Sequence, residues 1–266
     1  DGLATDIEVN GWGDTIWLTA QQRKDRDKAV FGELSYDLTD RLTLTGGMRF
    51  FRNDNSLKGF FGYGDGFSGS TGVSQCFSSE QFHGAPCVNL DKGTHENDHI
   101  GRVNLTWQID DKKMVYATWS EGYRPGGINR RGTLPPYTSD FLTNYEFGWK
   151  TSWADNKLVF NGALFRENWD DFQFSYLGQN GLTEIRNANS ARIDGLELDL
   201  AWAATYNLQI NGGFAWYDAK LTANYCGWLK PDGSPETSCP AGTVDPNGNV
   251  VSGVLITPAS PVTAKI

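Results

Sequence analysis

The sequence has no long apolar run and little of several residue types that mark common protein classes. Its 266 residues include 2 Met, 3 His and 4 Cys, and the 23 Lys and Arg are outnumbered by 32 Asp and Glu, giving a formal net charge of −9. An acidic chain is poorly matched to a nucleic-acid backbone, so we expect no nucleic-acid partner. No apolar stretch approaches the roughly 18–20 residues of a spanning helix, which excludes a helical membrane protein.

Glycine and aromatic residues are abundant instead, with 31 Gly, 10 Trp, 10 Tyr and 15 Phe. Apolar and polar residues alternate along almost the whole chain. Between residues 102 and 109, Val103, Leu105, Trp107 and Ile109 interleave with Arg102, Asn104, Thr106 and Gln108. Similar alternation recurs over 41–50, 144–153, 196–202 and 208–217. A period of two is that of a strand with one apolar and one polar face, so the sequence predicts an all-β chain of about nine strands.

Short polar turns alternate with longer connections along this pattern. The turns at 39–41, 110–113, 154–157 and 204–207 mostly carry the Asp and Asn that tight turns favour. The longer segments run over about 53–97, 124–139 and 220–262, with shorter ones near 23–28 and 178–182. We therefore predict an antiparallel up-and-down sheet with short turns at one end and long outer loops at the other.

The alternation fits two kinds of protein. A soluble barrel or sandwich would bury the apolar face, whereas a membrane barrel would turn that face to lipid. Two features favour lipid: charged residues lie within the polar faces, and tryptophans gather near strand ends, as in the interfacial girdles of membrane barrels. Those tryptophans are Trp107, Trp119, Trp149, Trp153, Trp202 and Trp216. The favoured fold is an antiparallel up-and-down transmembrane β-barrel.

Four segments in order along the chain strengthen this interpretation. They are AVFGELSYDLTDRLTLTGGMRF at 29–50, VYATWSEGYRPGG at 115–127, NYEFGWK at 144–150 and NANSARIDGLELD at 187–199. Together they resemble the barrel domain of TonB-dependent outer-membrane receptors. That resemblance implies that residues 1–266 are part of one such barrel domain, with about nine strands of an expected 22. Since nine strands cannot close around the family's plug domain, we expect the chain to be a fragment.

The resemblance also implies a function and partners. The expected function is an active-transport receptor in the bacterial outer membrane that takes up a scarce nutrient, such as siderophore-bound iron, with energy from TonB. The expected partners are the TonB complex, acting through a plug domain that this sequence lacks, the lipid bilayer with its lipopolysaccharide, and a small-molecule ligand; no cofactor is expected. Two alternatives remain: a passive outer-membrane porin or channel, and a secreted soluble β-sheet protein that binds glycans.

Residues of the predicted outer loops mix aromatic rings with guanidinium donors, a combination that suits a ligand with ring faces and acidic oxygens. The candidate ligand-binding residues are Phe60, Phe61, Tyr63, Phe67, Tyr123, Arg124, Asn129, Arg130, Arg131 and Tyr137. For the arginines, contact with lipopolysaccharide phosphates or plain solvation is an equal alternative. For residues 123–127, the better interpretation is a proline and glycine turn that leads the chain out of a strand.

The four cysteines form two local pairs, Cys76 with Cys87 and Cys226 with Cys239, each in a segment rich in Gly, Ser and Pro. Neither pair has the short C-x2-C spacing of a zinc site. We predict two disulfides that close outer loops, which implies an oxidising compartment.

Two motifs match catalytic or cofactor patterns by their letters. His95–His99 spells H-E-x-x-H, which binds zinc only on a helix, yet here it leads into an alternating strand. On an extended chain the two histidines would stand roughly 13 Å apart. The glycines of 64–69 match G-x-G-x-x-G but lack the flanking strand and helix that hold a pyrophosphate. The sequence therefore predicts neither a catalytic nor a metal site.

Overall fold

In the computed structural model, residues 7–177, 182–187 and 190–222 are described, and they form ten β-strands. The strands are β1 (Trp17–Thr39), β2 (Leu42–Tyr63), β3 (Leu90–Asp110), β4 (Lys113–Arg124), β5 (Asp140–Trp153), β6 (Leu158–Asp170), β7 (Gln173–Leu177), β8 (Thr183–Asn187), β9 (Ser190–Thr205) and β10 (Leu208–Leu221). A single 3-10 turn, η1, spans Val73–Gln75. Within the described ranges, no helix is long and apolar enough to cross a membrane.

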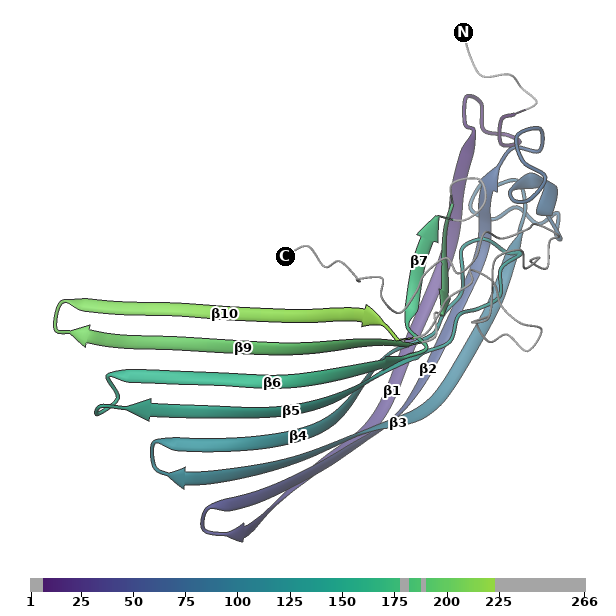
Figure 1. Cartoon of the computed structure of the whole chain (residues 1–266). Coiled ribbons are helices and arrows are strands. Elements are labelled where there is room, and N and C mark those ends of the chain that lie inside the picture. Colours follow the sequence, from purple (N-terminus) through teal and green to yellow (C-terminus); the bar gives the residue numbers. More distant parts are fainter. Residues whose placement is uncertain (1–6, 178–181, 188–189, 223–266) are drawn as a thin grey trace, which may run out of the picture.

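The strands form one large antiparallel sheet and one small hairpin. Eight strands pair in the order β1-β2-β3-β4-β5-β6-β9-β10, while β7 pairs with β8 alone (Figure 1). The all-β antiparallel prediction is therefore confirmed. Tight turns connect β1 to β2, β3 to β4, β5 to β6 and β9 to β10, at the four places that the sequence predicts. In the turn between β5 and β6, Ala154, Asp155 and Asn156 all have positive φ, which Asp and Asn tolerate better than most residues.

The first three strands are much longer than the others. β1 to β3 have 23, 22 and 21 residues, whereas β4 has 12 and β5 has 14. Two sequence predictions are corrected here. Segment 23–28 is not a connection but the middle of β1, and the predicted loop 53–97 shrinks to 64–89, because β2 continues to Tyr63 and β3 begins at Leu90. The expected loop at 124–139 agrees with the gap between β4 and β5.

The register gives the large sheet an apolar face and a polar face. Leu34 pairs with Gly46, and Gly46 with Val103, so one face collects the alternating apolar residues of neighbouring strands. Exposed members of this apolar face include Val30, Leu34, Met48, Val103, Leu105, Tyr145, Phe147, Leu164, Phe214 and Trp216. The polar face carries internal hydrogen bonds such as Asn104 to Thr118, at 2.7 Å. A sheet with this much apolar surface on one side requires an apolar environment there.

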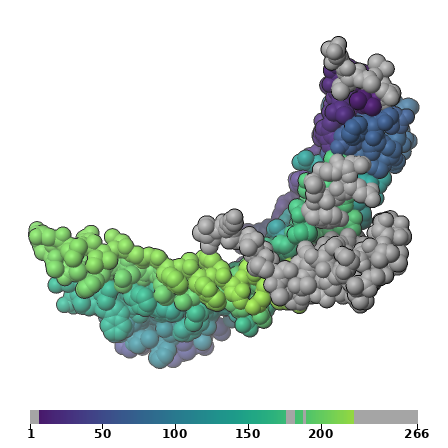
Figure 2. Space-filling view, turned by 45° about the horizontal axis from the view of Figure 1, so that its top comes forward, coloured from purple at the N-terminus to yellow at the C-terminus, as the bar shows by residue number. Residues whose placement is uncertain are grey.

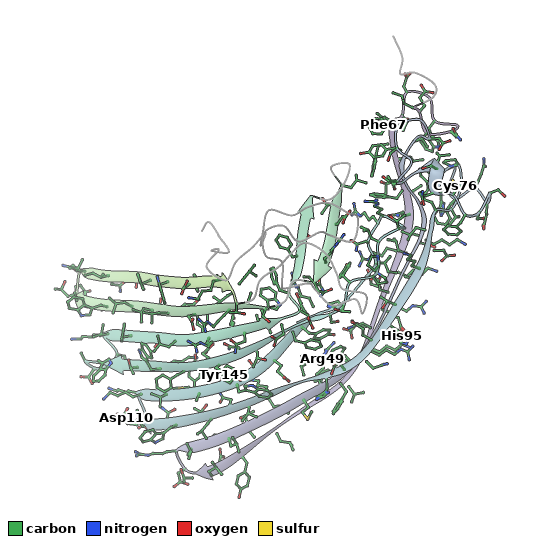
Figure 3. The ribbon with its side chains drawn as sticks, turned by 45° about the vertical axis from the view of Figure 1, so that its right-hand side comes forward. Arg49, Phe67, Cys76, His95, Asp110 and Tyr145 are labelled. Carbon is green, nitrogen blue, oxygen red and sulfur yellow. A yellow bond between two sulfur atoms is a disulfide. The ribbon has the colours of Figure 1, made fainter. Side chains whose placement is uncertain are left out.

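The two ends of the sheet differ. Figure 3 shows Asp110 beside a short turn at one end and Phe67 and Cys76 in the long loop at the other. Figure 2 shows that the purple and blue end of the sheet, with loop 64–89, forms an arm at an angle to the green strands. The long strands β1 to β3 thus extend past the others on the side of the long loops.

Loop 64–89 packs against the end of β2. Val9, Phe60, Ala85 and Cys87 form a buried cluster, and a disulfide joins Cys87 to Cys76 with a Cα–Cα distance of 5.9 Å. This is the first of the two predicted cysteine pairs. The second pair, Cys226 and Cys239, and most of the predicted outer loop 220–262 lie outside the described residues.

Candidate ligand-binding wall

The connection between β4 and β5, residues 125–139, lies across the polar face and is called here the folded-in loop. Its Ile128 is buried against Leu57 of β2 and Leu90 of β3, two residues that point to the polar face. The ammonium of Lys92 donates to the backbone oxygens of Gly132 at 2.5 Å and Leu134 at 2.9 Å. Burial lowers the pKa of Lys92 below its ordinary value. The loop therefore covers the sheet instead of projecting from it.

Glu96 of β3 fastens the end of the folded-in loop. Its carboxylate accepts hydrogen bonds from the backbone N–H of Ser139 at 3.0 Å and of Gly126 at 3.2 Å. The Ser139 hydroxyl donates to the same carboxylate and accepts from the Gly126 N–H at 3.0 Å. These contacts join Gly126, the second residue of the loop, and Ser139, its last residue, to one carboxylate, so the loop is closed at its base.

The hairpin β7–β8 holds the other side of the folded-in loop. Asn129 exchanges two hydrogen bonds with the backbone of Ile185, at 2.8 and 2.9 Å. Asn187 does the same with Thr138, at 2.9 Å in both directions. Two side-chain amides thus form the kind of paired hydrogen bonds that join neighbouring strands, here between the loop and the hairpin. They fix the height of the folded-in loop above the sheet.

Buried charges complete this attachment. Asp140 is fully buried and accepts from Arg124 Nε at 3.0 and 3.1 Å and from the Gln173 N–H at 2.8 Å. The guanidinium of Arg124 also lies 4.7 Å from the centre of the Trp169 ring. Nearby, the buried Glu184 carboxylate accepts from Arg131 at 3.0 Å. Removing the hydrogen-bond partners of a buried carboxylate costs free energy, because the charge is then left unpaired away from water. These contacts therefore resist opening of the loop.

Below the folded-in loop, the polar face carries an inner polar cluster built around two stacked rings, of which that of Phe51 is buried, with 4% of the residue exposed. The Tyr123 ring lies parallel to that of Phe51, with centroids 3.8 Å apart and 7° between the planes. The Tyr123 hydroxyl donates to Asp27 at 3.1 Å and accepts from Asn53 at 3.3 Å. Asp27 is also paired with Arg49 at 3.1 Å. β4 stops pairing with β3 after Ser120, which lets Tyr123 reach across to β2.

The upper edge of the inner polar cluster is formed by Arg23, Asp25 and Asn55. Arg23 Nε pairs with Asp25 at 3.0 Å, and Asn55 donates its amide to the same carboxylate. Burial by itself would lower the pKa of Arg23, but its interactions with Tyr137 and Asp25 outweigh that effect and hold the pKa above its ordinary value. The Oδ1 atom of Asn55 is buried without a hydrogen-bond partner in the described part of the chain. An unsatisfied buried acceptor marks a place where a donor would be favourable.

The structure places the predicted ligand residues in three groups. Phe60 and Phe61 lie on β2 with 0% and 6% of their surfaces exposed, so they belong to the core and not to a projecting loop. Asn129 and Tyr137 are buried in the folded-in loop, while Arg124 and Arg131 are committed to ion pairs. The exposed members are Phe67 in loop 64–89 and Arg130 in the folded-in loop; Tyr63 is half-buried beside Trp17, and Tyr123 joins the inner polar cluster.

The sequence interpretation missed Arg23, Asp25, Asp27, Arg49 and Phe51 as candidates. The signal for Asp25 and Asp27 is the alternation of charge sign over residues 24–28, in which odd residues point to the polar face and even ones to the apolar face. That alternation has no hydrophobic contrast, so a search for apolar periodicity does not detect it.

The H-E-x-x-H segment lies within β3. His95 is paired with Asp54 and His99 with Phe50 on the apolar face, while Glu96 points to the polar face. A strand separates the two imidazoles by four residues, or roughly 13 Å. Across the residues that the structure describes, no group of three or more His, Cys, Asp or Glu side chains could hold a metal ion.

The fold and the two faces define a class of protein, namely the wall of an outer-membrane β-barrel with lipid on the apolar face and a lumen on the polar face. A sequence model of the family described as TonB dependent receptor-like, beta-barrel, matches residues 5–260. The chain belongs to this family of outer-membrane transporters, which are not enzymes. The alternative of a secreted soluble glycan-binding protein is therefore wrong.

Curated relatives include the pesticin receptors of Yersinia enterocolitica and Yersinia pestis, each 28% identical to this chain over 193 residues. The aligned part is 69% of this chain and 25% of each relative. The chain thus spans about a quarter of their length. Among solved structures, the ferric yersiniabactin uptake receptor FyuA of Yersinia pestis matches with a TM-score of 0.56 and 23% identity, over 76% of this chain and 28% of that one. The ferric-catecholate import receptor Fiu of E. coli K12 matches with a TM-score of 0.55 and 17% identity, over 82% and 30%.

Proposed function

We propose that this chain forms part of an active uptake receptor for a ferric siderophore, energised by TonB through a plug domain. The observation that carries the proposal is the inner polar cluster, in which a stacked aromatic pair is flanked by two guanidiniums on the lumen face. Arg23 and Arg49 are paired with Asp25 and Asp27, but their side chains remain 44% and 36% exposed, so a ligand in the lumen can reach both. Rings and guanidiniums together suit a chelate with aromatic faces and acidic oxygens.

Several solved proteins that share the fold are described as receptors for iron chelates or siderophores. FyuA is described as a ferric yersiniabactin uptake receptor, Fiu as a ferric-catecholate import receptor and PiuA of Acinetobacter baumannii as a siderophore receptor. OprC, a copper transporter, has the same fold with a TM-score of 0.55 and 18% identity, over 76% of this chain and 30% of that one. Since these structural likenesses carry the fold alone, the ligand class rests on the cluster and requires its own test.

The test is a titration of the purified full-length receptor with each member of a panel of ferric siderophores. Quenching of tryptophan fluorescence measures the binding. Tyr123→Ala removes the ring that stacks on Phe51, and we expect binding about two- to tenfold weaker, since stacking of one aromatic ring of a ligand on Tyr123 would contribute about 0.5–1.5 kcal/mol beyond the buried area. Tyr123→Phe keeps the ring and should bind almost normally. Tyr145→Ala is the matched control, because Tyr145 lies on the apolar face, away from the lumen.

Two results would contradict the proposal. The first is binding of copper ions or an uncharged sugar with no binding of any ferric chelate, which would replace the ligand class. The second is equal weakening by the Tyr123→Ala and Tyr145→Ala variants, which would show that the inner polar cluster has no special part in binding. The passive porin alternative predicts no saturable binding at all.

A further inference from the structure

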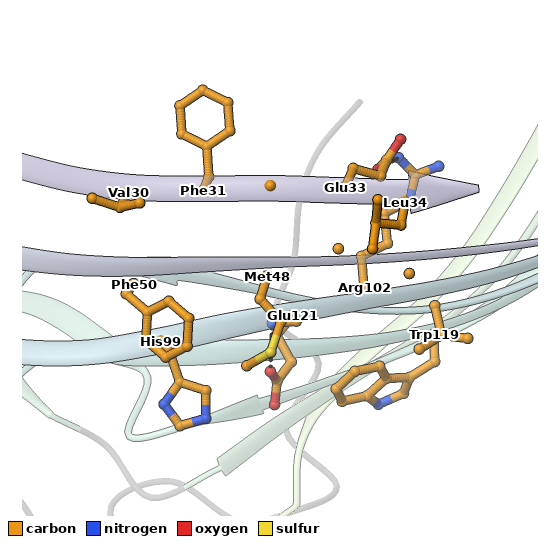
Figure 4. Close-up of a pocket in the computed structure, with 15 residues that line it drawn as sticks. Val30, Phe31, Glu33, Leu34, Met48, Phe50, His99, Arg102, Trp119 and Glu121 are labelled. Carbon is orange, nitrogen blue, oxygen red and sulfur yellow. Dashed lines mark hydrogen bonds and ion pairs between the residues drawn. The ribbon is translucent and has the colours of Figure 1, made fainter. Parts of the chain in front are cut away.

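Arg23 of the inner polar cluster lies between the sheet and the folded-in loop. It occupies an odd position of β1, and odd residues of this strand point to the polar face. Figure 4 shows the same alternation nearer the short turns, where Phe31 and Glu33 lie on the opposite side of the strands from Met48. The guanidinium of Arg23 therefore projects toward the loop that covers the polar face.

On the sheet side, Arg23 is held by Asp25 and, through it, by β2. The Arg23 Nε atom donates to the Asp25 carboxylate at 3.0 Å. The Asn55 amide of β2 donates to the same carboxylate, and Asn55 is buried, with 7% of its surface exposed. Because β2 is paired on both sides, this support for Arg23 comes from the interior of the sheet.

On the loop side, the Tyr137 hydroxyl accepts a hydrogen bond from the Arg23 guanidinium. A Cβ atom at Gly127 would lie 2.6 Å from the Tyr137 hydroxyl oxygen and 3.0 Å from Arg23 Nη2, so the two groups meet over the bare backbone of this glycine. A second contact lies two positions earlier on β1, where the Gln21 amide donates to the Arg130 backbone oxygen at 3.2 Å. The folded-in loop thus crosses the polar face as far as β1.

The folded-in loop also fixes the position of Tyr137. Gly127 and Tyr137 exchange two backbone hydrogen bonds, both at 2.9 Å. Glu96 holds the residues beside this bridge, Gly126 and Ser139, through their backbone N–H groups. Tyr137 is buried, with 8% of its surface exposed. A hydroxyl held in this way presents a fixed partner to the guanidinium.

We propose that the folded-in loop positions the guanidinium of Arg23 for the ligand, with Tyr137 as the positioning residue. Arginine has a long, flexible side chain, and holding it in one conformation before the ligand arrives removes part of the entropy cost of binding. Tyr137 acts through Arg23 and need not touch the ligand itself. The inference rests on the proposed function, because it requires that acidic oxygens of the ligand bind Arg23.

The first test is a double-mutant cycle on the full-length receptor, with the dissociation constant of the ferric siderophore that binds best as the readout. Tyr137→Phe keeps the ring and the backbone bridge but removes the hydroxyl, and we expect binding about two- to tenfold weaker. In an Arg23→Gln background, Tyr137→Phe should have no further effect, because the residue that it positions is gone. Equal weakening in both backgrounds, or none in either, would overturn the inference.

Gly127→Ala tests the same contact from the side of the glycine. Its Cβ pushes the ends of Tyr137 and Arg23 apart, while the backbone at 127 has no positive φ that would strain an alanine, so binding should weaken as in Tyr137→Phe. Gly122→Ala is the matched control, because a Cβ there meets nothing within 4 Å. It should bind like the wild type.

Hydrogen exchange separates positioning from collapse of the loop. In Tyr137→Phe, amides of residues 125–139 should exchange at the wild-type rate, because the bonds from Glu96 to Gly126 and Ser139 remain. Faster exchange across the whole loop would assign the weaker binding to loop opening and would overturn the role of Tyr137.

A measurement without ligand separates this inference from the proposed function. Phenylglyoxal modifies arginine side chains, and peptide mass spectrometry gives the rate at each arginine of the ligand-free receptor. We expect faster modification of Arg23 in Tyr137→Phe, whereas Arg49, which is paired with Asp27, should react at the wild-type rate. An unchanged rate at Arg23 would overturn the inference whatever the receptor binds. Failure of the wild-type receptor to bind any ferric siderophore would instead contradict the proposed function.

Discussion

Replacement of Glu96 by alanine should release the folded-in loop. The Glu96 carboxylate holds the backbone N–H groups of Gly126 and Ser139, together with the Ser139 hydroxyl. In the variant, the Gly126 N–H keeps Ser139 Oγ as an acceptor, whereas the Ser139 N–H keeps none among the described residues. The loss therefore falls mainly on the two bonds made by Ser139.

The magnitude follows from these contacts. A hydrogen bond to a charged group contributes about 1.5–3 kcal/mol net, and because Glu96 is half-buried the lower end applies, or about 3 kcal/mol for two bonds. That free energy raises the opening constant of the loop about 100-fold. Opening of this kind is local, so the rest of the sheet should keep its protection from exchange.

The assay is hydrogen–deuterium exchange with mass spectrometry on the full-length receptor, read in peptides that contain residues 125–139. Glu96→Gln keeps one acceptor oxygen and should exchange at an intermediate rate. His95→Ala is the control, because His95 points to the other face of β3. If the Ser139 amide of the Glu96→Ala variant exchanged at the wild-type rate, Glu96 would not be the residue that holds the loop closed.

Three further predictions concern stability and are each measured on the full-length receptor in detergent. Asp171→Asn should raise the thermal midpoint at pH 7, because burial and neighbouring carboxylates hold the pKa of Asp171 above its ordinary value. The gain should vanish below about pH 4, where the wild-type carboxyl is protonated in the folded and the unfolded protein alike. Gly162→Val should lower the free energy of unfolding by about 1–3 kcal/mol, because a Cβ there lies 2.2 Å from the Trp149 ring, whereas Gly212→Val should be nearly neutral. Cys76→Ser should increase proteolytic cleavage within loop 64–89, because the Cys76–Cys87 disulfide that closes this loop contributes about 3 kcal/mol in the chain-entropy account. Equal cleavage of the variant and the wild type would contradict this prediction.

The parts of the sheet that touch lipid were predictable from the sequence, because there one face must be apolar and the other polar. Strand segments such as Arg102–Ile109 and the tight turns between them follow from that contrast. Above the lipid band both faces of β1 meet water or polar groups, so residues 23–28 are charged on both sides and the contrast disappears. The same reason explains why the extension of β2 from Asn53 to Tyr63 resembled a loop.

The candidate site was predictable only in part. Aromatic and arginine composition identified Tyr123 and the residues of the folded-in loop, but not that Asn129 and Tyr137 are buried there. The stacking of Tyr123 on Phe51 depends on β4 leaving β3 after Ser120, and nothing in the alternation pattern marks that departure. Contacts between strands that are not neighbours arise from tertiary geometry, which local periodicity does not encode.

Energised uptake is the most direct test of the central claim that this chain forms the wall of a siderophore receptor. The measurement is accumulation of radioactive iron, supplied as the ferric siderophore that binds best, by cells that express the full-length receptor in place of their own, with and without TonB. The account predicts saturable uptake that is lost without TonB and strongly reduced by Tyr123→Ala but not by Tyr145→Ala. Uptake that continues unchanged without TonB, or that does not saturate, would contradict it and would establish a passive channel instead.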